Sequence, residues 1–202
     1  MTPERIDQLL ESFPTFRVLV VGDMYLDENV YGSVTGVSLE APIPIFEVRE
    51  RRYNPGAAGN AACNVAALGA KVRVIGVVGD DVNAGILRRE FEKRGVDSSL
   101  LVADAARATN TYGKLRAGGH NTPTQEVLRT DTPKPTLITG ETEAKVCAKI
   151  RELAPSFDAI MLGDQAVSVL SDKVLDTVRE AQRRRELREK RVSGSVLSLE
   201  FK

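Results

Sequence analysis

Three short apolar runs constrain the fold of this chain more than any other feature of its sequence. They span residues 16–22, 71–79 and 158–163 and are rich in Val, Ile and Leu. Such continuous runs are typical of strands buried on both faces of a parallel sheet. Helical spacing predicts helices before, between and after them: Thr2–Phe13, a small-residue stretch ending at Gly69, Val82–Arg94, Glu141–Leu153 and Ser168–Arg185. Strands and helices that alternate in this way predict an α/β fold with right-handed crossovers.

The small-residue stretch begins with a turn signal, Asn54-Pro55-Gly56, and continues almost entirely in Ala, Val and Leu up to Gly69. A helix of such small side chains lets another backbone segment or a ligand approach closely. Asn60 and Asn64 share one face near its N-terminal end, where free N–H groups and the positive end of the helix dipole point outward. The sequence leaves two interpretations open: a helix that binds hydroxyl groups, or one that packs tightly on a sheet with Asn60 near a cap.

Acidic residues follow the predicted core strands, and those after the first and third strands are the candidate site residues. Asp23 and Asp27 come after the first strand, and Asp164 comes after the third. In open α/β sheets, ligands bind just beyond the carboxyl ends of the strands. Carboxylates accept hydrogen bonds from hydroxyl groups, so these acids suit a polyol, although Asp23 is also a candidate for a turn cap.

Two further segments alternate apolar with polar residues, as strands with one wet face do. The first is 29–53, and the second is a hairpin formed by 110–116 and 124–130 around Gly118-Gly119-His120-Asn121. Pro42 and Pro44 forbid a central position in a sheet. We therefore expect a small antiparallel flap outside the main sheet, with an apolar face that a ligand or a partner subunit covers.

The composition excludes several functions. Lys plus Arg equal Asp plus Glu at 28 each, so no net field gathers nucleic acid or anionic membrane. One His and two widely spaced Cys form no zinc pattern, and neither a dinucleotide fingerprint nor a Walker loop is present. The N-terminal residues lack the apolar core of a signal peptide, and no apolar run has the length of a membrane span, so we expect a cytoplasmic protein. The basic stretch 179–191 predicts a solvent-exposed helical extension, followed by a tail.

Several ordered motifs carry a resemblance to a known family. The block Asn54–Gly79, with its Asn and Gly spacing, resembles the N-terminal signature of the PfkB/ribokinase-like sugar kinases. Within that family the chain is most similar to the heptose-7-phosphate kinase branch, through three segments: Val20–Asp27, Ser38–Pro44 and Gln125–Arg129. The resemblance covers roughly residues 15–180. It implies a three-layer α/β/α sandwich over residues 1–185, with a β-flap lid near 29–53 and 108–131 that two subunits often share as a dimer clasp.

The resemblance also implies roles for individual residues. Asp27 would bind sugar hydroxyls, Gly56 and Asn60 would contact the sugar through the helix start, and Asp164 would take another hydroxyl. Gln125 and Arg129 would line the substrate side, and Arg129 is a natural ligand for the phosphate of a phosphorylated sugar. The candidate substrate-binding residues are thus Asp23, Asp27, Gly56, Asn60, Gln125, Arg129 and Asp164. We expect no catalytic residue among them.

The sequence departs from the family pattern in two ways. Ala57 stands where the family has the second glycine of a Gly-Gly pair, and its methyl group reduces the space for a substrate. The family implies ATP and Mg, but the later Gly-Ala-Gly-Asp segment with the general base, and the strands that hold adenine, are not found. We therefore expect a domain truncated on its C-terminal side, with a charged tail at 186–202, and no turnover from this chain alone. The alternative is a non-catalytic module, derived from such a kinase, that binds a sugar phosphate or dimerises.

Overall fold

A parallel sheet built from the predicted apolar runs forms the centre of the structure. The computed structural model describes residues 2–118, 123–165 and 168–192, with side chains up to residue 184. The sheet has the strand order β10-β1-β4-β6 and is parallel throughout. Its strands are β1 (Arg17–Gly22), β4 (Lys71–Ile75), β6 (Val96–Asp97) and β10 (Ala159–Gly163). The run 71–79 divides at Gly76: its second part, β5 (Val77–Val78), pairs instead with β7 (Val102–Ala103).

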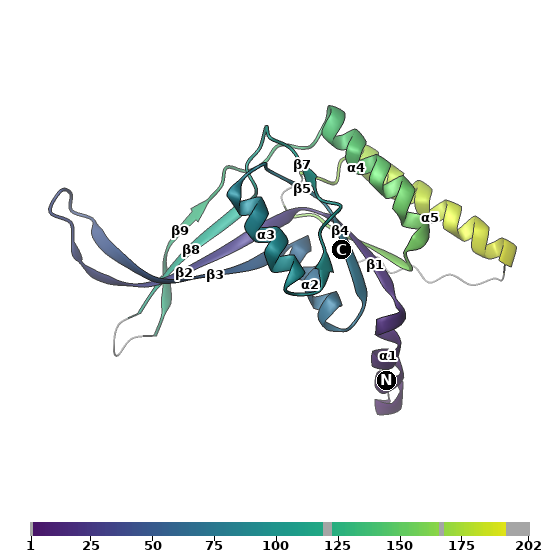
Figure 1. Ribbon diagram of the computed structural model, residues 1–202, viewed down its shortest axis with the longest axis horizontal. Helices are drawn as coiled ribbons and strands as arrows, with labels where there is room; N and C mark the ends of the chain where they lie inside the picture. Colours follow the sequence, from purple (N-terminus) through teal and green to yellow (C-terminus); the bar gives the residue numbers. More distant parts are fainter. Residues whose placement is uncertain (1, 119–122, 166–167, 193–202) are drawn as a thin grey trace.

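Helices cover both faces of this sheet (Figure 1). Leu19 and Val21 of β1 join one buried cluster with α4 (Gly140–Leu153) and α5 (Asp172–Val192). The alternate residues Val18 and Val20 join a second cluster with residues of α2 (Ala58–Ala67) and α3 (Val82–Glu92). Because successive side chains of a strand point to opposite faces, one strand supplies both layers of core. The predicted three-layer α/β/α arrangement is confirmed.

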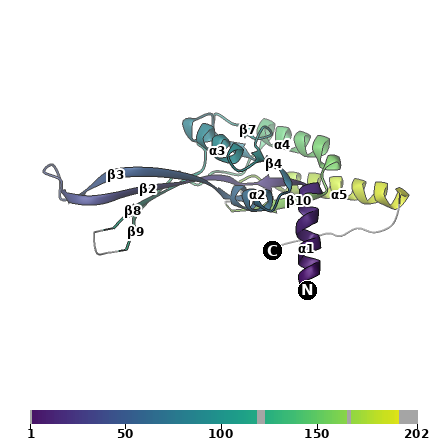
Figure 2. The same cartoon turned by 60° about the horizontal axis from the view of Figure 1, so that its bottom comes forward.

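The flap is a second four-stranded sheet that extends away from the helices as a thin blade (Figures 1 and 2). Its strand order is β3-β2-β8-β9, with β2 (Met24–Val37), β3 (Pro44–Ala57), β8 (Thr111–Ala117) and β9 (Gln125–Asp131). The expectation of a purely antiparallel flap is wrong, because β2 and β8 pair in parallel. Both strands run outward from the body, so they align in the same direction, and the two outer pairs are antiparallel.

The predicted turn at Asn54-Pro55-Gly56 is also wrong. These residues are extended in β3 and pair with Asp27, Leu26 and Tyr25 of β2. Pairing with a long neighbouring strand overrides the local turn preference. Pro55 is tolerated because β3 is the edge strand, where a missing N–H need not cost a ladder hydrogen bond.

Helices also lie at both ends of the described part of the chain. α1 (Pro3–Ser12) begins as predicted, with Pro3 in its first turn and the Thr2 hydroxyl accepting a hydrogen bond from the Arg5 N–H at 3.4 Å. α1 buries none of its residues. One-turn helices at Phe13–Thr15 and Ala154–Ser156 precede β1 and β10.

At the other end, α5 starts later than predicted, at Asp172, and continues to Val192, so part of the expected tail is helical. The rest of that tail, 193–202, lies outside the described residues, as do Gly119, His120 and Asn121 of the hairpin loop.

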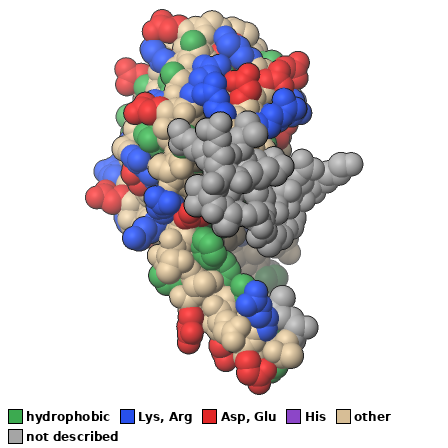
Figure 3. Space-filling view, turned by 90° about the vertical axis from the view of Figure 1, so that its right-hand side faces the viewer, with side chains coloured by type: hydrophobic (Ala, Val, Ile, Leu, Met, Phe, Trp, Pro, Cys, Tyr) green, Lys and Arg blue, Asp and Glu red, His purple; other side chains and the backbone are tan. Residues whose placement is uncertain are grey.

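The surface carries both signs of charge. Acidic and basic side chains are interspersed over the face shown in Figure 3, in keeping with the zero net charge. In the part of the chain that the structure describes, no helix is long and apolar enough to cross a membrane.

Candidate functional site

The end of β1, the end of β10 and the start of α2 meet at one junction. The Asp23 N–H donates to the Gly163 carbonyl at 3.0 Å, and the Ala58 N–H donates to the Asp23 carbonyl at 3.1 Å. Gly163 packs so closely on α2 that an added Cβ would lie 2.4 Å from the Ala58 Cβ. Asp164, the next residue, is therefore adjacent to the first turn of α2, which contains Asn60. Both Asp164 and Asn60 are exposed to solvent.

Asp23 is a structural clamp within this junction. Its side chain is 0% exposed. The carboxylate accepts hydrogen bonds from the Ser168 hydroxyl at 2.6 Å, the Val169 N–H at 3.1 Å and the Gln165 N–H at 2.9 Å. These donors all belong to the loop after β10. The position of Asp23 does not support the prediction that it binds substrate; the alternative, that it caps a turn, fits.

Asp27 occupies a different environment, on the flap near its base. Its carboxylate lies 3.2 Å from the Lys114 ammonium of β8, and the two side chains are 26% and 21% exposed. A Cβ added at Gly56 on the neighbouring strand would lie 3.2 Å from the Asp27 Oδ2. Glycine at position 56 therefore leaves this carboxylate uncovered. Asp27 is reachable, charged and held in place.

Arg129 lies on the same face of the flap as Asp27. Its guanidinium carbon is 4.1 Å from the centroid of the Tyr112 ring, and its Nε donates to the Asp131 Oδ1 at 2.8 Å. The hydrogen bond to Asp131 raises the pKa of Arg129. The strand register places Tyr112 beside Asp27 and Arg129 beside Lys114, so these side chains share one face.

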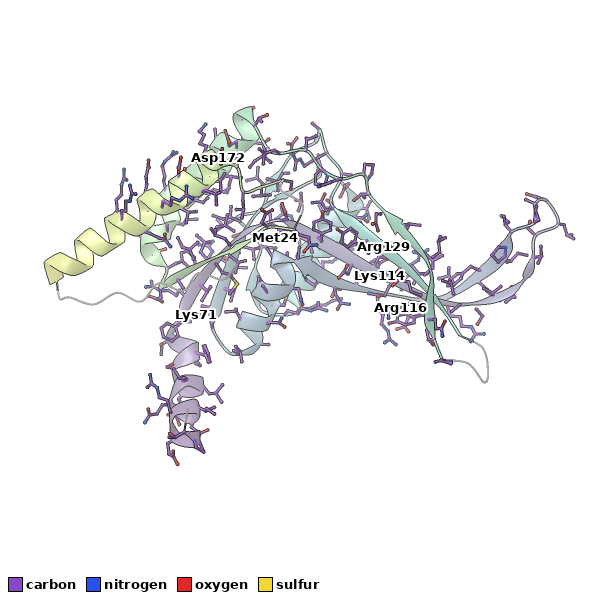
Figure 4. All side chains as sticks on the ribbon, turned by 180° about the vertical axis from the view of Figure 1, so that it is seen from behind. Met24, Lys71, Lys114, Arg116, Arg129 and Asp172 are labelled. Carbon is purple, nitrogen blue, oxygen red and sulfur yellow. The ribbon has the colours of Figure 1, made fainter. Side chains whose placement is uncertain are left out.

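We call this surface the charged flap face and define it by Tyr25, Asp27, Tyr112, Lys114, Arg116, Arg129 and Asp131. Figure 4 shows Arg129, Lys114 and Arg116 following one another along β9 and β8, away from α4 and α5. Sequence reasoning missed Tyr112, Lys114 and Arg116. Their spacing of two along one predicted strand was the available signal, because it places all three on a single face.

Gln125 does not join this group. It pairs with Ala117 toward the outer end of the flap, four residues along β9 from Arg129. That spacing corresponds to roughly 13 Å along a strand. The predicted association of Gln125 with Arg129 on the substrate side is therefore not supported by the strand register.

Comparison with known proteins identifies the family. The family description "pfkB family carbohydrate kinase" matches residues 15–182. The chain belongs to the pfkB carbohydrate kinase family. Among its curated relatives, the bifunctional protein HldE of Rhodopseudomonas palustris (strain BisB5) is 37% identical over 180 residues, and that of Geotalea uraniireducens (strain Rf4) is 34% identical over 184 residues. The matched parts are 89% and 91% of this chain but 36% of each relative, so the chain spans about a third of their length.

Solved structures confirm the ribokinase-like fold. A carbohydrate kinase from Agrobacterium tumefaciens has a TM-score of 0.58 at 19% identity, over 85% of this chain and 51% of that one. Escherichia coli phosphofructokinase-2 in complex with fructose-6-phosphate has a TM-score of 0.58 at 14% identity, over 83% and 52%. Arabidopsis thaliana ribokinase complexed with ribose and ATP has a TM-score of 0.55 at 14% identity, over 83% and 51%. At these identities the likeness concerns the fold.

Ala57 is held in a conformation that favours glycine. Its φ is +52° and its ψ is −129°, and among the described residues it is the one non-glycine residue with positive φ. It links the last pair of β3 to the first turn of α2. A methyl group at such a position costs on the order of 1–3 kcal/mol of backbone strain.

We therefore expect Ala57→Gly to stabilise the pfkB fold by about 1 kcal/mol, because the relief of strain exceeds the added entropy of the unfolded chain. Urea denaturation at equilibrium measures this change. Ala61→Gly is the matched control within α2, where glycine should instead destabilise by roughly 0.5–1 kcal/mol. A loss of stability in both variants would contradict the strain at Ala57.

Proposed function

We propose that this chain carries the sugar-binding part and the lid of a kinase that transfers a phosphoryl group from ATP to a hydroxyl of a heptose phosphate. The observation that carries the proposal is the Asp27–Lys114 pair on the same flap face as Arg129. It combines an acceptor for hydroxyl groups with cations for a phosphate. The sequence identity to HldE proteins supports a heptose as the sugar.

In this proposal, Asp27 accepts hydrogen bonds from one or two sugar hydroxyls, while Lys114 holds the carboxylate in place. Asn60 supplies a side-chain amide at the start of α2, and Asp164 accepts from a further hydroxyl at the end of β10. Gly56 keeps the approach to Asp27 open. Each group is suited to a ligand with several neighbouring hydroxyls.

The phosphate of the substrate is assigned to the cationic end of the charged flap face. Lys114 and Arg129 are direct partners in the strand register, one pleat repeat beyond the row of Asp27. That repeat is roughly 7 Å, a suitable separation between a sugar ring and its terminal phosphate. Arginine offers a planar fork to phosphate oxygens, and lysine adds a point charge.

ATP and Mg enter the proposal through the family. Among the described residues, no group of three or more His, Cys, Asp or Glu is placed to hold a metal ion. We derive no catalytic step through either group. The contribution assigned to this chain is to bind the sugar phosphate, orient it and cover it with the flap, in the cytoplasm.

The experiment that tests the function is calorimetric titration with a heptose 7-phosphate and with the unphosphorylated heptose. We expect the phosphorylated sugar to bind at least tenfold more tightly, since it adds charge-assisted hydrogen bonds. Equal affinities would contradict the phosphate assignment. We expect no release of ADP when ATP and Mg are added to this chain alone. Release of ADP would contradict that expectation and would also contradict the alternative, a non-catalytic sugar-phosphate-binding or dimerisation module.

The opposite face of the flap suggests a homodimer. The register places Val34, Phe46, Val48 and Leu128 together on this apolar flap face, facing away from Asp27. Three of them are about half exposed: Val34 at 52%, Val48 at 46% and Leu128 at 55%. Exposed apolar side chains gathered on a thin sheet favour a protein partner, and a second copy can pair its identical face in a symmetric clasp.

Leu128→Lys should weaken this dimer by at least about 100-fold, because a symmetric interface loses the burial of two leucine side chains at about 1.5–3 kcal/mol each and places two like charges together. Sedimentation equilibrium over a range of concentrations measures the dissociation constant. Val82→Lys on α3 is the control, since Val82 is 76% exposed but lies off the flap. A monomeric wild-type chain, or an equal effect of both variants, would contradict the clasp.

A further inference from the structure

An aromatic stack crosses three neighbouring strands of the flap and ends under Arg129. Tyr25 of β2 is 4% exposed, and its ring centroid lies 4.6 Å from that of Tyr112 on β8. The Arg129 guanidinium of β9 lies over the Tyr112 ring at 4.1 Å. Tyr112 thus contacts both a buried aromatic ring and a cation. Burial and the contact with Tyr112 raise the pKa of Tyr25, which keeps its hydroxyl protonated.

Two contacts fix the Arg129 side chain in this arrangement. The guanidinium carbon lies 4.1 Å from the centroid of the Tyr112 ring, and Asp131 accepts a hydrogen bond from Nε–H at 2.8 Å. Within the described residues, the terminal nitrogens of Arg129 make no hydrogen bond to protein. They form the outer prongs of a planar fork, which matches two oxygens of one phosphate. The side chain of Arg129 is 44% exposed, so a ligand can reach that fork.

We propose that Tyr112 is a positioning residue for the phosphate ligand: its ring holds the Arg129 guanidinium in the plane in which the terminal nitrogens take up a phosphate. This inference rests on the proposed function and adds a residue that does not itself bind the substrate. A free arginine side chain loses considerable rotamer entropy when it binds an anion. Tyr112 reduces that loss by ordering the guanidinium before the ligand arrives.

The chain offers a matched control on the same sheet. Arg52 of β3 lies over the ring of Tyr31 at 4.9 Å, and its Nε donates to Glu50. This second arginine–tyrosine pair has the same chemistry, but Tyr31 lies three pleat repeats from Tyr25 along β2. Changing Tyr31 therefore tests whether removal of an aromatic ring beneath any arginine of this sheet changes the affinity for the ligand.

The experiment is calorimetric titration of the full chain with a heptose 7-phosphate, the unphosphorylated heptose and inorganic phosphate. Tyr112→Leu should weaken binding of both phosphate-containing ligands by about five- to twentyfold, in line with the strength of a partly desolvated cation–π contact and the restored side-chain freedom. Its affinity for the unphosphorylated heptose should stay within twofold. Tyr112→Phe retains the ring face and should bind all three as the wild type does, as should Tyr31→Leu.

A double variant completes the test. Because Tyr112 acts through Arg129, Tyr112→Leu combined with Arg129→Gln should bind no more weakly than Arg129→Gln alone. Additive losses would overturn the inference, as would an unchanged phosphate affinity in Tyr112→Leu. A drop in the affinity of Tyr112→Leu for the unphosphorylated heptose, with a lower melting temperature, would also overturn it, since that pattern marks a structural role.

The same variants distinguish a failure of the proposed phosphate site from a failure of the positioning role of Tyr112. If Arg129→Gln binds the phosphorylated sugar as tightly as the wild type, the phosphate lies elsewhere, whatever Tyr112 does. If Arg129→Gln loses affinity and Tyr112→Leu does not, the phosphate assignment stands and only the positioning role is lost.

Discussion

Asp27→Asn should reduce the affinity for a heptose by about 100- to 1000-fold, the largest effect on ligand binding that we expect from a single change. The carboxylate accepts hydrogen bonds from sugar hydroxyls, and a bond to a charged group contributes about 1.5–3 kcal/mol. Two such bonds at the lower end of that range, about 3–4 kcal/mol together, correspond to that loss, at about 1.4 kcal/mol for each tenfold change. Asparagine keeps the shape but loses the charge, and it leaves the Lys114 ammonium without its partner at 3.2 Å. Calorimetric titration measures the effect.

Glu28→Gln provides the control for this prediction. Glu28 is the next residue on β2, pairs with Arg51 and has a similar exposure of 23%, but it points to the opposite face. Glu28→Gln should therefore keep the affinity for the heptose within twofold of the wild type. The free energy of unfolding of Asp27→Asn is a second check. Because the partly exposed pair of Asp27 and Lys114 contributes less than about 1 kcal/mol, this variant should remain folded. Retained heptose affinity in a folded Asp27→Asn protein would show that the sugar binds elsewhere.

Asp23→Ala should destabilise the protein by about 3–5 kcal/mol, which is the largest effect on stability that we expect. The substitution leaves two buried donors, the Ser168 hydroxyl and the Val169 N–H, without their acceptor, together with the N–H of the more exposed Gln165. Each buried donor left unsatisfied costs about 1–3 kcal/mol. The loop after β10 would then lose its attachment to β1, and Asp164 would lose its place beside α2. Urea denaturation at equilibrium gives the free energy of unfolding.

Asp80→Ala is the comparison for Asp23. Asp80 also follows an apolar run, yet it is exposed, and its removal should change the free energy of unfolding by less than about 0.5 kcal/mol. Asp23→Asn keeps one acceptor oxygen, so its loss of unfolding free energy should lie between those of Asp23→Ala and Asp80→Ala. A loss for Asp23→Ala no larger than that for Asp80→Ala would contradict the clamp.

The layers of the fold could be predicted because they follow from local patterns. The apolar runs at 16–22 and 71–79 became largely buried strands, and helical periodicity identified the helices on both faces. The run at 158–163 became the strand β10, but its residues are partly or fully exposed because β10 lies at the edge of the sheet. The turn predicted at Asn54–Gly56 failed because a local signal was outweighed by pairing with β2, a partner distant in sequence.

The site could be predicted only in part, because contacts between strands that are distant in sequence decide which side chains meet. An acid after a strand was correctly located in sequence, but its neighbours decide whether it faces solvent, as Asp27 does, or the interior, as Asp23 does. Lys114 was missed because the parallel pairing of β8 with β2 cannot be read from alternation alone. Gln125 and Arg129 were grouped through the family resemblance, although they lie four residues apart along β9.

The central proposal is that Asp27, Asn60 and Asp164 surround one polyhydroxylated ligand. The most direct measurement is a nitrogen-15 amide titration of the full chain with a heptose 7-phosphate. We predict that the amide signals of these three residues and of Arg129 shift together and give a single dissociation constant. Shifts that saturate at different concentrations, or that concentrate at the surface pocket lined by Arg88, Glu92 and Asp97, would contradict it.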